Sequence, residues 1–343
     1  MENRPKISVL VPSLNTAAFI CQCLDSVVNQ TLADIEIICI DAGSTDGTTE
    51  ILQGYQKKDF RIQLIHSSRK SYGYQMNLGL DAAAGDYIGI IESDDWAEAD
   101  MFEKLWQTAE ENSADVVWAN FYSWYPRNKN ENILFENFAG CEYDKLTTAY
   151  HNNNRLFTVS PAIWSGIYKK DFLKKNKIRF NETPGASYQD VSFHFMVCAD
   201  AQRIILLKKP FLHYRRDNEE SSVNSTGKVY CICDEMHLCE DFIHSEGLDI
   251  NIMLPILVQI KLNNYFWNFC RISQRFQWKF LLQMRKELLA HDKDGLIHRK
   301  DYTDNNWRIL QQILHQPLRF YLAFCKGNRL FTWVRERYFS MKN

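Results

Sequence analysis

Short apolar runs alternate with helical segments over the first 120 residues, and this alternation restricts the possible folds more than any other feature of the chain. The runs KISVLV (6–11), IEIICI (35–40), IQLI (62–65) and DYIGII (86–91) are almost wholly apolar, as strands buried on both faces are. The segments between them place apolar residues at helical spacing. Buried strands separated by helices predict an α/β fold with a mostly parallel central sheet flanked by helices.

The same patterns predict where the remaining elements lie. Asp46 suits the N-cap of the second helix, and Gly85 suits the stop after the third. From about residue 228 the apolar spacing is helical, which predicts a sheet domain over 1–227 and a C-terminal helical region over 228–343. The other predicted elements are a helix that includes 19–28, helices over 46–58, 72–84 and 99–112, a fifth strand over 115–121, and a polar, irregular insertion over 125–160.

Bulk properties exclude several classes of protein. Hydrophobic residues make up 45% of the chain and charged residues 24%, which is ordinary globular composition. The net charge of −2 gives no reason to expect a nucleic-acid partner. No apolar run reaches the roughly 20 residues that span a bilayer, and the run before Pro12 is too short for a secretory signal. A cytoplasmic protein is therefore expected.

One group of possible zinc ligands lies in the segment YCICDEMHLCEDFIH (230–244). Structural zinc sites usually pair their cysteines as C-x₂₋₄-C knuckles. The spacing here lacks that pairing, so a helix is predicted rather than a zinc site. The residues concerned are Cys231, Cys233, His237, Cys239 and His244.

Three carboxylates stand at the end of the fourth predicted strand. Glu92, Asp94 and Asp95 lie within four residues, so their charges repel one another unless a cation is present. Mg²⁺ and Mn²⁺ favour oxygen ligands and are often shared with substrate phosphates. Parallel sheets bind ligands beyond the carboxyl ends of their strands, where this group is expected. The alternative is a surface turn that caps the helix near Asp100.

The turn after the second strand, in IICIDAGSTDGT, supports a similar interpretation. Asp41 ends the strand, Gly43 allows a tight turn, and Ser44 and Asp46 are placed to cap the next helix. Amides at such a helix start can meet an anionic or polar ligand, although this segment by itself is better explained as a capped turn without one. The sequence contains neither G-x-G-x-x-G nor G-x-x-x-x-G-K-[ST], which argues against the usual dinucleotide site and against a P-loop.

Five segments, taken in their order along the chain, resemble family 2 glycosyltransferases, which have the GT-A fold. The resemblance is strong over residues 5–120, weaker over 160–225 and essentially absent beyond 230. No single motif is specific, but the ordered set is. The segments that carry it are VLVPSLN (9–15), DSVVNQT (25–31), IEIICIDAGSTDGT (35–48), GYQMNLGLDAAAGDYIGIIESDD (73–95) and YQDVSFHF (188–195).

The resemblance implies an inverting glycosyltransferase of surface polysaccharide synthesis. Its donor would be a nucleoside-diphosphate sugar, with uridine as the expected base, and its acceptor a hydroxyl of a glycan or lipid-linked molecule. Asp94 and Asp95 match the family's metal-binding D-x-D motif for Mn²⁺ or Mg²⁺. Asp190 matches the family's catalytic base, with an N-cap of the following helix as the alternative. The implied nucleotide-sugar residues are Pro12, Ser13, Asn15, Asp41, Gly43, Ser44, Asn77 and Asp94.

Arg215 and Arg216 are further candidates for the donor, in the stretch HYRRDNEESS (213–222). Guanidinium groups match phosphate oxygens, and family members often carry a similar Tyr-x-Arg stretch. A solvated basic turn explains the pair equally well, and His213 is a weaker candidate metal ligand. The residues expected on the acceptor side are Trp164, Ser165 and Tyr168, with a core role as the alternative for Trp164.

Two departures from the family pattern keep other functions open. Ala42 stands where many members have an Asp that contacts the base, and Glu92 begins the acidic group at the strand end. One alternative is an inactive relative that only binds a nucleotide sugar or glycan, although the retained aspartates argue against it. Another is a nucleotidyltransferase, but PSLNTAAF lacks the Gly-rich, Lys/Arg-containing loop that such enzymes usually need after their first strand.

The last segment, residues 317–343, carries six Lys or Arg residues against one Glu, together with seven aromatic residues. Basic residues beside exposed aromatic ones suit an anionic membrane surface. The alternative is a helical pair packed on the catalytic domain. The segment thus leaves open a peripheral contact with the inner face of the plasma membrane.

Overall fold

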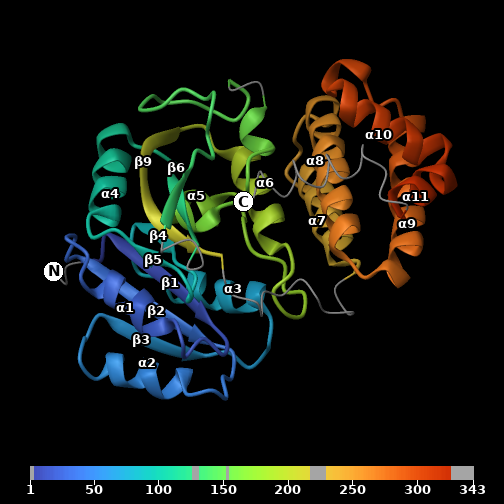
Figure 1. The fold of residues 1–343 in the computed structure, drawn as a ribbon. Coiled ribbons are helices and arrows are strands. Elements are labelled where there is room, and N and C mark those ends of the chain that lie inside the picture. The colour runs from blue at the N-terminus through green and yellow to red at the C-terminus, as the bar shows by residue number, and fades with distance from the viewer. Residues whose placement is uncertain (1–3, 126–130, 152–153, 217–228, 326–343) are drawn as a thin grey trace. The chain divides into compact units, whose positions relative to one another are not determined.

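The computed structural model describes residues 4–125, 131–151, 154–216 and 229–325. The chain divides into two compact units, Met1–Glu220 and Ser221–Asn343, which are described separately (Figure 1). The predicted division between residues 227 and 228 lies outside the described residues and stays a prediction.

Unit 1 is built on a nine-stranded sheet in the order β3-β2-β1-β4-β8-β6-β9-β5, with β7 added at β6. Its strands are β1 (Ile7–Ser13), β2 (Ile35–Asp41), β3 (Ile62–His66), β4 (Tyr87–Ile90), β5 (Trp96–Ala97), β6 (Val116–Tyr125), β7 (Glu131–Phe135), β8 (Gly166–Lys169) and β9 (Ile204–Arg215). Its helices are α1 (Ile20–Val28), α2 (Thr48–Gln56), α3 (Tyr72–Ala82), α4 (Met101–Asn112), α5 (Lys170–Lys175) and α6 (Gln189–Asp200), with short 3₁₀ turns at Arg155–Phe157 and Ile163–Ser165.

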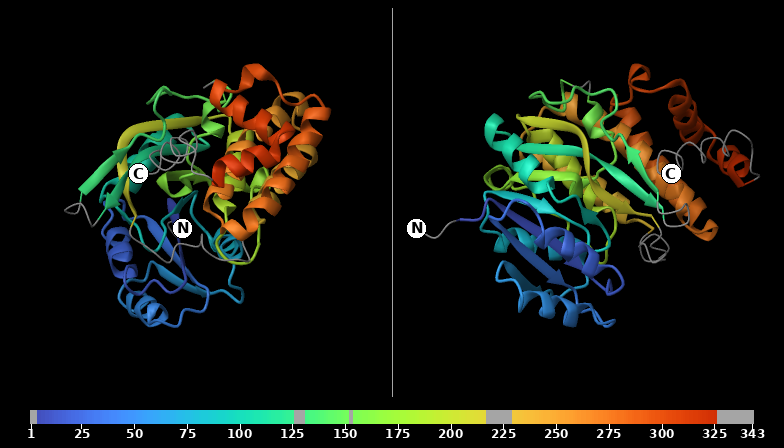
Figure 2. Two further views of the ribbon diagram at one scale, coloured as in Figure 1. Left: turned by 45° about the vertical axis from the view of Figure 1, so that its right-hand side comes forward. Right: turned by 60° about the vertical axis from the view of Figure 1, so that its left-hand side comes forward.

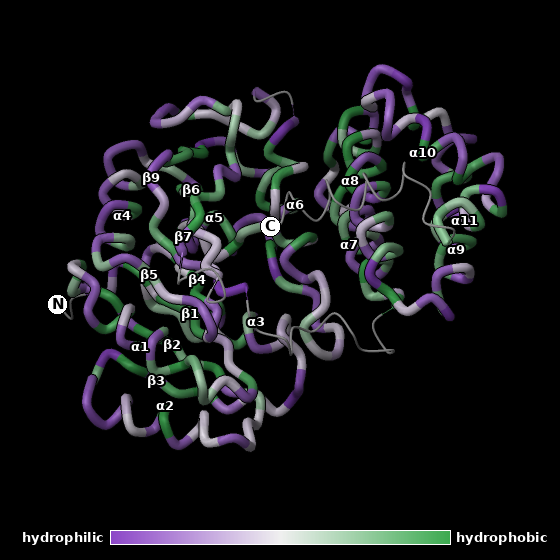
Figure 3. Tube along the Cα trace, viewed as in Figure 1, coloured by the Kyte–Doolittle hydropathy of each residue, from purple (hydrophilic) through white to green (hydrophobic). Residues whose placement is uncertain are grey.

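The four strands β1 to β4 form the predicted parallel part of the sheet. β1 lies between β2 and β4, with Ile7 opposite both Ile35 and Tyr87. All seven residues of β1 are buried. Figure 2 shows β1–β3 side by side from two further directions, and Figure 3 colours β2 as mostly hydrophobic. The unbroken apolar runs thus reflect strands that are covered on both faces.

The rest of the sheet is mixed in direction. β8 pairs antiparallel with both β4 and β6, whereas β9 runs parallel to β6 and antiparallel to β5. β7 lies in the segment predicted to be irregular, where it pairs antiparallel with β6. Four of its five residues are exposed, so it lacks the buried apolar pattern by which strands are predicted.

Two of the predicted helix boundaries are wrong. α2 begins after Gly47, whose φ of 97° makes it the N-cap, and Asp46 instead accepts hydrogen bonds from the amides of Thr48 (3.1 Å) and Ala17 (2.9 Å). α3 ends at Ala82, before the predicted stop at Gly85. A Cβ on Gly85 would lie 2.6 Å from the Ser8 amide nitrogen, so glycine is needed there for close packing.

Unit 2 is helical over its described residues, as the sequence predicts. The zinc candidates lie along its first helix, and among the described residues of the chain no three His, Cys, Asp or Glu side chains are grouped to hold a metal. In the same ranges, every helix is too short or too polar to cross a membrane. The helices are α7 (Cys231–Ser245), α8 (Ile250–Arg271), α9 (Gln274–Lys293), α10 (Asp304–His315) and α11 (Pro317–Cys325), with a 3₁₀ turn at Arg299–Asp301.

A buried ammonium group joins three of these helices. Lys261 of α8 is 1% exposed, and its Nζ lies 2.8 Å from Glu240 Oε1 of α7 and 3.2 Å from Glu287 Oε2 of α9. His291 Nε2, also on α9, lies 3.0 Å from the same Nζ. A buried charge needs partners to offset the loss of its hydration. The contacts of Lys261 with α7 and α9 therefore fix these two helices relative to α8.

Candidate active site

The carboxyl ends of β1, β2 and β4 lie side by side because the three strands are parallel neighbours. Among the described residues, four buried side-chain polar atoms lack a hydrogen-bond partner, and three of them lie on loops at this end of the sheet. Buried polar atoms are normally paired, so this concentration indicates a place where a ligand would complete the bonding. The three atoms are Thr16 Oγ1, Asp95 Oδ2 and Ser187 Oγ.

Asp41 organises the turn that follows β2. Its carboxylate, on a residue that is 1% exposed, accepts bonds from Ser44 Oγ at 2.5 Å and Thr49 Oγ1 at 2.8 Å. It also accepts from the amides of Gly43 (3.3 Å) and Ser44 (3.2 Å), while Gly43 has a φ of 79° that glycine adopts cheaply. These bonds fix the position of the Asp41 carboxylate, and its contact with a nucleotide stays a prediction.

Asn15 joins the loop after β1 to the loop after β2. Its amide donates to Ser44 Oγ at 2.9 Å, and its Oδ1 accepts from the Thr45 amide at 2.8 Å. Asn15 has a φ of 55°, a left-handed conformation that Asn tolerates better than most residues. Predicted nucleotide residues from two loops thus form one connected surface.

Pro12 and Ser13 end β1 at the base of this surface. Pro12 lies beyond Leu10, the last β1 residue that pairs with β4, so its missing amide hydrogen breaks no bond on that side. Gln75 of α3, which sequence analysis missed, donates to the carbonyls of Ser13 at 2.9 Å and Ile40 at 2.7 Å. This buried amide holds the ends of β1 and β2 together.

The acidic residues after β4 interact electrostatically with Asp190. The pKa of Glu92 is raised to about 8, chiefly by burial and also by the charges of Asp94 and Asp190, although a hydrogen bond from Tyr72 Oη at 2.6 Å opposes the rise. Burial and then the charge of Asp94 raise the pKa of Asp95 well above its usual range. The fold therefore brings Asp190 into the electrostatic field of the strand-end carboxylates, as the resemblance implies.

The Asp95 carboxylate fits a bound cation. Its Oδ1 accepts from the Arg215 amide at 2.8 Å, whereas its buried Oδ2 has no hydrogen-bond partner in the described part of the chain. A divalent cation would lower the repulsion with Asp94 and give this oxygen a partner. Mg²⁺ commonly uses one or two protein carboxylates and completes its shell with water and substrate phosphates, so a third protein ligand is not required.

Arg215 lies in a box of aromatic rings, so the alternative of a solvated basic turn does not hold for it. Its guanidinium carbon lies 4.8 Å from the ring centre of Phe19, 5.1 Å from that of Trp96 and 4.5 Å from that of Trp124. Its Nε donates to Asp94 O at 2.8 Å, and one Nη donates to Gln22 Oε1 at 2.6 Å. These contacts make Arg215 a support of the acidic turn, and its contact with the donor diphosphate stays a prediction.

The neighbours of Arg215 are also engaged. Arg216 donates to Ser123 Oγ at 3.2 Å and stacks over the Tyr214 ring at 4.5 Å. Both ring nitrogens of His213 are used, one within 2.8 Å of Asn132 Oδ1 and the other within 2.9 Å of Glu98 Oε1. The suggestion that His213 joins the metal is therefore wrong for this arrangement.

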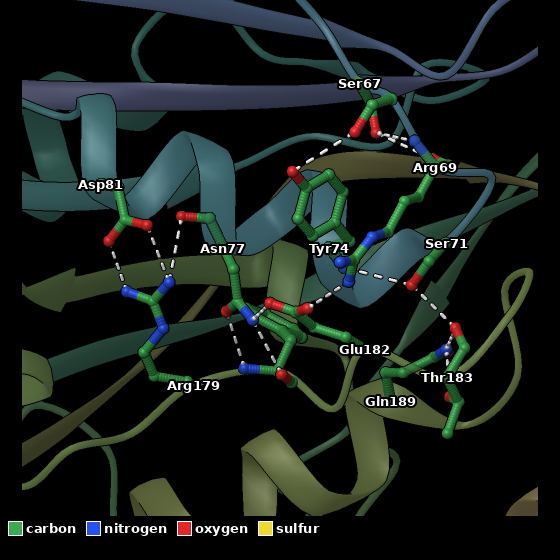
Figure 4. Close-up of polar contacts among 12 residues, drawn as sticks. Ser67, Arg69, Ser71, Tyr74, Asn77, Asp81, Arg179, Glu182, Thr183 and Gln189 are labelled. Atoms are coloured by element: carbon green, nitrogen blue, oxygen red, sulfur yellow. Dashed lines mark hydrogen bonds and ion pairs between the residues drawn. The ribbon is translucent and has the colours of Figure 1, made fainter.

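Asn77 ties α3 to the chain before α6. Its Nδ2 donates to Phe180 O at 2.9 Å and to Glu182 Oε1 at 3.1 Å, and its Oδ1 accepts from the Phe180 amide at 3.0 Å (Figure 4). The residue is 4% exposed. Both ends of the amide thus have a structural role, and the contact of Asn77 with a nucleotide sugar stays a prediction.

Asp190 is the second residue of α6, so it is not the N-cap that the alternative interpretation requires. That position belongs to Tyr188, whose φ of 68° is unusual for a residue with a side chain. Asp190 Oδ1 accepts from the Val191 amide at 3.0 Å. Its carboxylate thus sits in the first turn of a helix, where the backbone amides favour negative charge.

The residues expected on the acceptor side are packed into the core. Trp164 is stacked on Tyr214 with ring centres 5.0 Å apart, which supports the core alternative. The Ser165 hydroxyl donates to Ala162 O at 2.8 Å, and the Tyr168 hydroxyl donates to Ile163 O at 2.7 Å. The hydroxyls of both residues thus bond to main-chain carbonyls of their own segment.

Comparison with known proteins identifies the family. Residues 8–176 match the sequence model of glycosyl transferase family 2. These residues belong to this family. The matched residues include the loops after β1 and β2 and the acidic turn after β4, and Asp190 lies beyond the match.

Several curated relatives are glycosyltransferases. The chain is 30% identical over 220 residues to the uncharacterized glycosyltransferase EpsJ of Bacillus subtilis, covering 62% of each protein. It is 27% identical over 259 residues to the cholesterol galactosyltransferase of Borreliella burgdorferi, covering 74% of this chain and 67% of that protein. With the putative glycosyltransferase EpsH of Bacillus subtilis the match spans 61% of the relative, so the chain spans about three fifths of these Bacillus proteins.

A solved structure with the same fold is that of S. aureus TarS, residues 1–349, in complex with UDP-GlcNAc. It matches with a TM-score of 0.72 and 19% sequence identity, covering 94% of this chain and 92% of the other. The GT-A fold expected for this family 2 chain is therefore confirmed. Unit 1 ends at Glu220, so a match of this extent also reaches into unit 2, where the sequence alone shows no resemblance.

Proposed function

We propose that this chain is an inverting glycosyltransferase that moves a sugar from a nucleoside-diphosphate donor to an acceptor hydroxyl. One observation carries the proposal: after burial, the charges of Asp95, Asp94 and Asp190 all help to raise the pKa of Tyr214, so the three carboxylates share one neighbourhood. Carboxyl groups with a raised pKa at the ligand-binding end of an α/β sheet, here Glu92 and Asp95, are characteristic of a catalytic site. Membership of family 2 supports the reaction class.

Asp94 and Asp95 would hold the divalent cation, Mn²⁺ or Mg²⁺, together with the donor diphosphate. When bound, the ion supplies a positive charge that stabilises the departing diphosphate. The chain's contribution is a rigid mount for these carboxylates. Arg215 binds the main chain at Asp94 through Nε and the side chain of Asp95 through its amide, so both residues are held from one side.

Asp190 would accept the proton of the acceptor hydroxyl as that oxygen attacks the anomeric carbon. The bond to the diphosphate oxygen breaks as the new glycosidic bond forms on the opposite face, so the anomeric configuration inverts. Asp190 lies in the first turn of α6, where the backbone amides would favour a negative charge. Proton transfer of this kind contributes roughly 10²–10⁴-fold to the rate.

The donor is proposed to be a UDP-sugar. S. aureus TarS, which shares the fold, has been solved with UDP-GlcNAc and with UDP. The loops after β1 and β2 would surround the nucleoside in this chain, with Asn15 and Ser44 already linked at 2.9 Å. Ala42 stands where many family members have Asp, so the side chain at this position would supply no carboxylate to the base.

The acceptor is proposed to be a hydroxyl of a glycan or lipid-linked molecule in surface polysaccharide synthesis. The relative from Bacillus spizizenii is a poly(ribitol-phosphate) beta-glucosyltransferase, 30% identical over 224 residues.

Peripheral contact with the inner face of the plasma membrane is part of this proposal. The segment expected to make this contact, residues 317–343, begins with α11 (Pro317–Cys325), and residues 326–343 lie outside the described residues. Stronger co-sedimentation of the full chain than of a truncation after residue 316 with anionic liposomes would support it, and equal partitioning would remove it.

The test is donor turnover over a panel of UDP-, GDP- and dTDP-sugars with Mn²⁺ or Mg²⁺. We expect metal-dependent release of UDP from one UDP-sugar and little release from the other nucleotides. If every donor stays intact while a nucleotide sugar still binds in calorimetry, the chain is instead an inactive nucleotide-sugar-binding relative.

A further inference from the structure

Two loops of unit 1 that are far apart in sequence are paired beside the candidate site (Figure 4). They are residues 67–71, between β3 and α3, and residues 181–188, before α6. Gly185 joins them as a strand residue would, since its amide donates to Lys70 O at 2.8 Å and its carbonyl accepts from the Tyr72 amide at 3.0 Å. The side-chain contacts between the loops are Ser71 Oγ to Thr183 O (2.7 Å) and Arg69 Nη1 to Glu182 Oε2 (3.1 Å).

The loop at 67–71 is also joined to the turn after β2. The Ser67 amide donates to Asp41 O at 2.8 Å, directly beside the turn that Asp41 organises. A continuous set of hydrogen bonds therefore runs from the proposed nucleotide surface, through residues 67–71, to the loop that leads into α6.

Gln189 closes this set of bonds next to Asp190. It is 2% exposed, and its Oε1 accepts from the Ser187 amide at 2.5 Å. Its Nε2 donates to Thr183 Oγ1 at 2.9 Å and to Gly185 O at 3.1 Å. This arrangement requires one acceptor and one donor group on the same side chain, which Gln has and Glu lacks at neutral pH.

The backbone here adopts a conformation that needs support. Tyr188, between Ser187 and Gln189, has a φ of 68°, and a left-handed conformation at a residue with a side chain persists when its surroundings impose it. The bonds of Gln189 span this residue, from Ser187 on one side to the start of α6 on the other. They therefore determine the direction in which the first turn of α6, and with it Asp190, leaves the loop.

We infer that Gln189 is a positioning residue for Asp190, and that the paired loops couple the nucleotide surface to the proposed base. The inference rests on the proposed function, because it assigns Gln189 a role only if Asp190 takes part in transfer. A structural role alone would change stability and leave the rate and the pH dependence of the folded enzyme unaltered.

Two nearly isosteric variants of the full-length chain test this inference. Gln189→Glu removes both donor contacts and places a carboxylate beside Asp190, and Thr183→Val removes one acceptor. Gln107→Glu, on α4 and away from the site, is the matched control for the added charge. The measurements are kcat, KM for the donor and the pH profile of transfer, with thermal unfolding to verify folding.

We expect Gln189→Glu to lower kcat by up to about 100-fold, the loss typical of a misplaced catalytic group. The ascending limb of its pH profile should move to higher pH, because a neighbouring carboxylate disfavours the charged form of Asp190. Thr183→Val should lower kcat about fivefold, as the loss of one hydrogen bond does. In both, KM for the donor should stay within about twofold, and Gln107→Glu should match the wild type.

Each outcome separates this inference from the proposed function. Wild-type kcat and an unmoved pH limb in Gln189→Glu would overturn the positioning role while leaving the proposed function intact. If Gln189→Glu does not fold, an unchanged kcat in Thr183→Val decides against the inference in the same way. If the wild type transfers no sugar, or Asp190→Asn transfers normally, the proposed function fails and the inference falls with it.

Discussion

Among the described residues, Asp95 has the one carboxylate oxygen that is buried without a hydrogen-bond partner. Its Oδ1 accepts from the Arg215 amide at 2.8 Å, and its buried Oδ2 has no hydrogen-bond partner in the described ranges. An unpaired buried polar atom costs about 1–3 kcal/mol, and more when it is charged. Burial and the charge of Asp94 both raise the pKa of Asp95, which is the response expected of a carboxylate without its counter-ion. We propose that the bound metal ion would offset this cost, because it would give the unpaired oxygen of Asp95 a partner.

Asp190→Asn keeps the shape of the side chain and removes its ability to accept a proton. Transfer should fall by about 10²–10⁴-fold, the usual contribution of a general base. Nucleotide affinity in calorimetry should change little, because the nucleotide loops after β1 and β2 are untouched. Normal transfer by this variant would remove Asp190 as the base.

Arg215→Lys keeps the charge but loses the planar fork that contacts three aromatic rings and two oxygen atoms. The free energy of unfolding of unit 1 should fall by about 2 kcal/mol, because charge-assisted hydrogen bonds contribute about 1.5–3 kcal/mol. Chemical denaturation measures this loss. Arg216→Lys is the control, and an equal loss in both variants would contradict a special role for Arg215.

At the scale of elements, the close packing of α3 against the chain before α6 sets the geometry of the site. A Cβ on Gly73 would lie 1.8 Å from Asn181 O, closer than any real contact. Arg179 pairs with Asp81 of α3, its Nη2 lying 2.9 Å from Asp81 Oδ2 (Figure 4). This packing places the loop at 181–188, and the helix it leads into, beside the strand ends.

Gly73→Ala should displace residues 181–182 and destabilise unit 1 by about 1–3 kcal/mol, the usual cost of overpacking, or more because the clash is with backbone. Transfer should fall as well, because the displaced segment leads to Asp190. Gly54→Ala on α2 is the control, since a Cβ there meets nothing within 4 Å. Equal stability of the two variants would show that α3 and residue 181 are not in close contact.

The parallel half of the sheet was predictable because each strand there is a continuous apolar run with a helix beside it in sequence. In the other half, β6 was predicted as the fifth strand, but the pairings were not, because they are distant or short: β8 at Gly166–Lys169 inserts between β4 and β6, and β5 is two residues long. The acidic residues were predicted from their position at a strand end. The aromatic box of Arg215 draws on Phe19, just before α1, and on β5 and β6, so no local pattern could indicate it.

At the scale of the whole molecule, the carboxyl groups of the two units have pKa values shifted in opposite directions. Unit 1 has carboxylates whose pKa is raised and which a cation would stabilise. Unit 2 has Glu240, where burial would raise the pKa but hydrogen bonds and charges from His291 and Lys261 outweigh it and lower the pKa to about 2. Acid should therefore weaken unit 2 through a group that the proposed chemistry does not use.

Because the pKa of Glu240 is lowered in the folded protein, unit 2 loses stability as the pH falls. Glu240 contributes stability that is fully present above the ordinary value of 4.5 and is lost as pH falls toward about 2. Glu240→Gln should therefore flatten the pH dependence of unit 2 unfolding in that range, measured by hydrogen exchange of α7 and α8 peptides. Asp241→Asn, the exposed neighbour, is the control, and a wild-type profile in Glu240→Gln would refute the assignment.

The most direct test of the central claim is a crystal structure with UDP and Mn²⁺, in which anomalous scattering locates the metal. We predict one manganese ion between the diphosphate and the strand-end turn, coordinated by Asp94 or Asp95, with the nucleoside against the loops after β1 and β2. A nucleotide bound with its diphosphate away from both aspartates, or manganese bound elsewhere, would contradict the account.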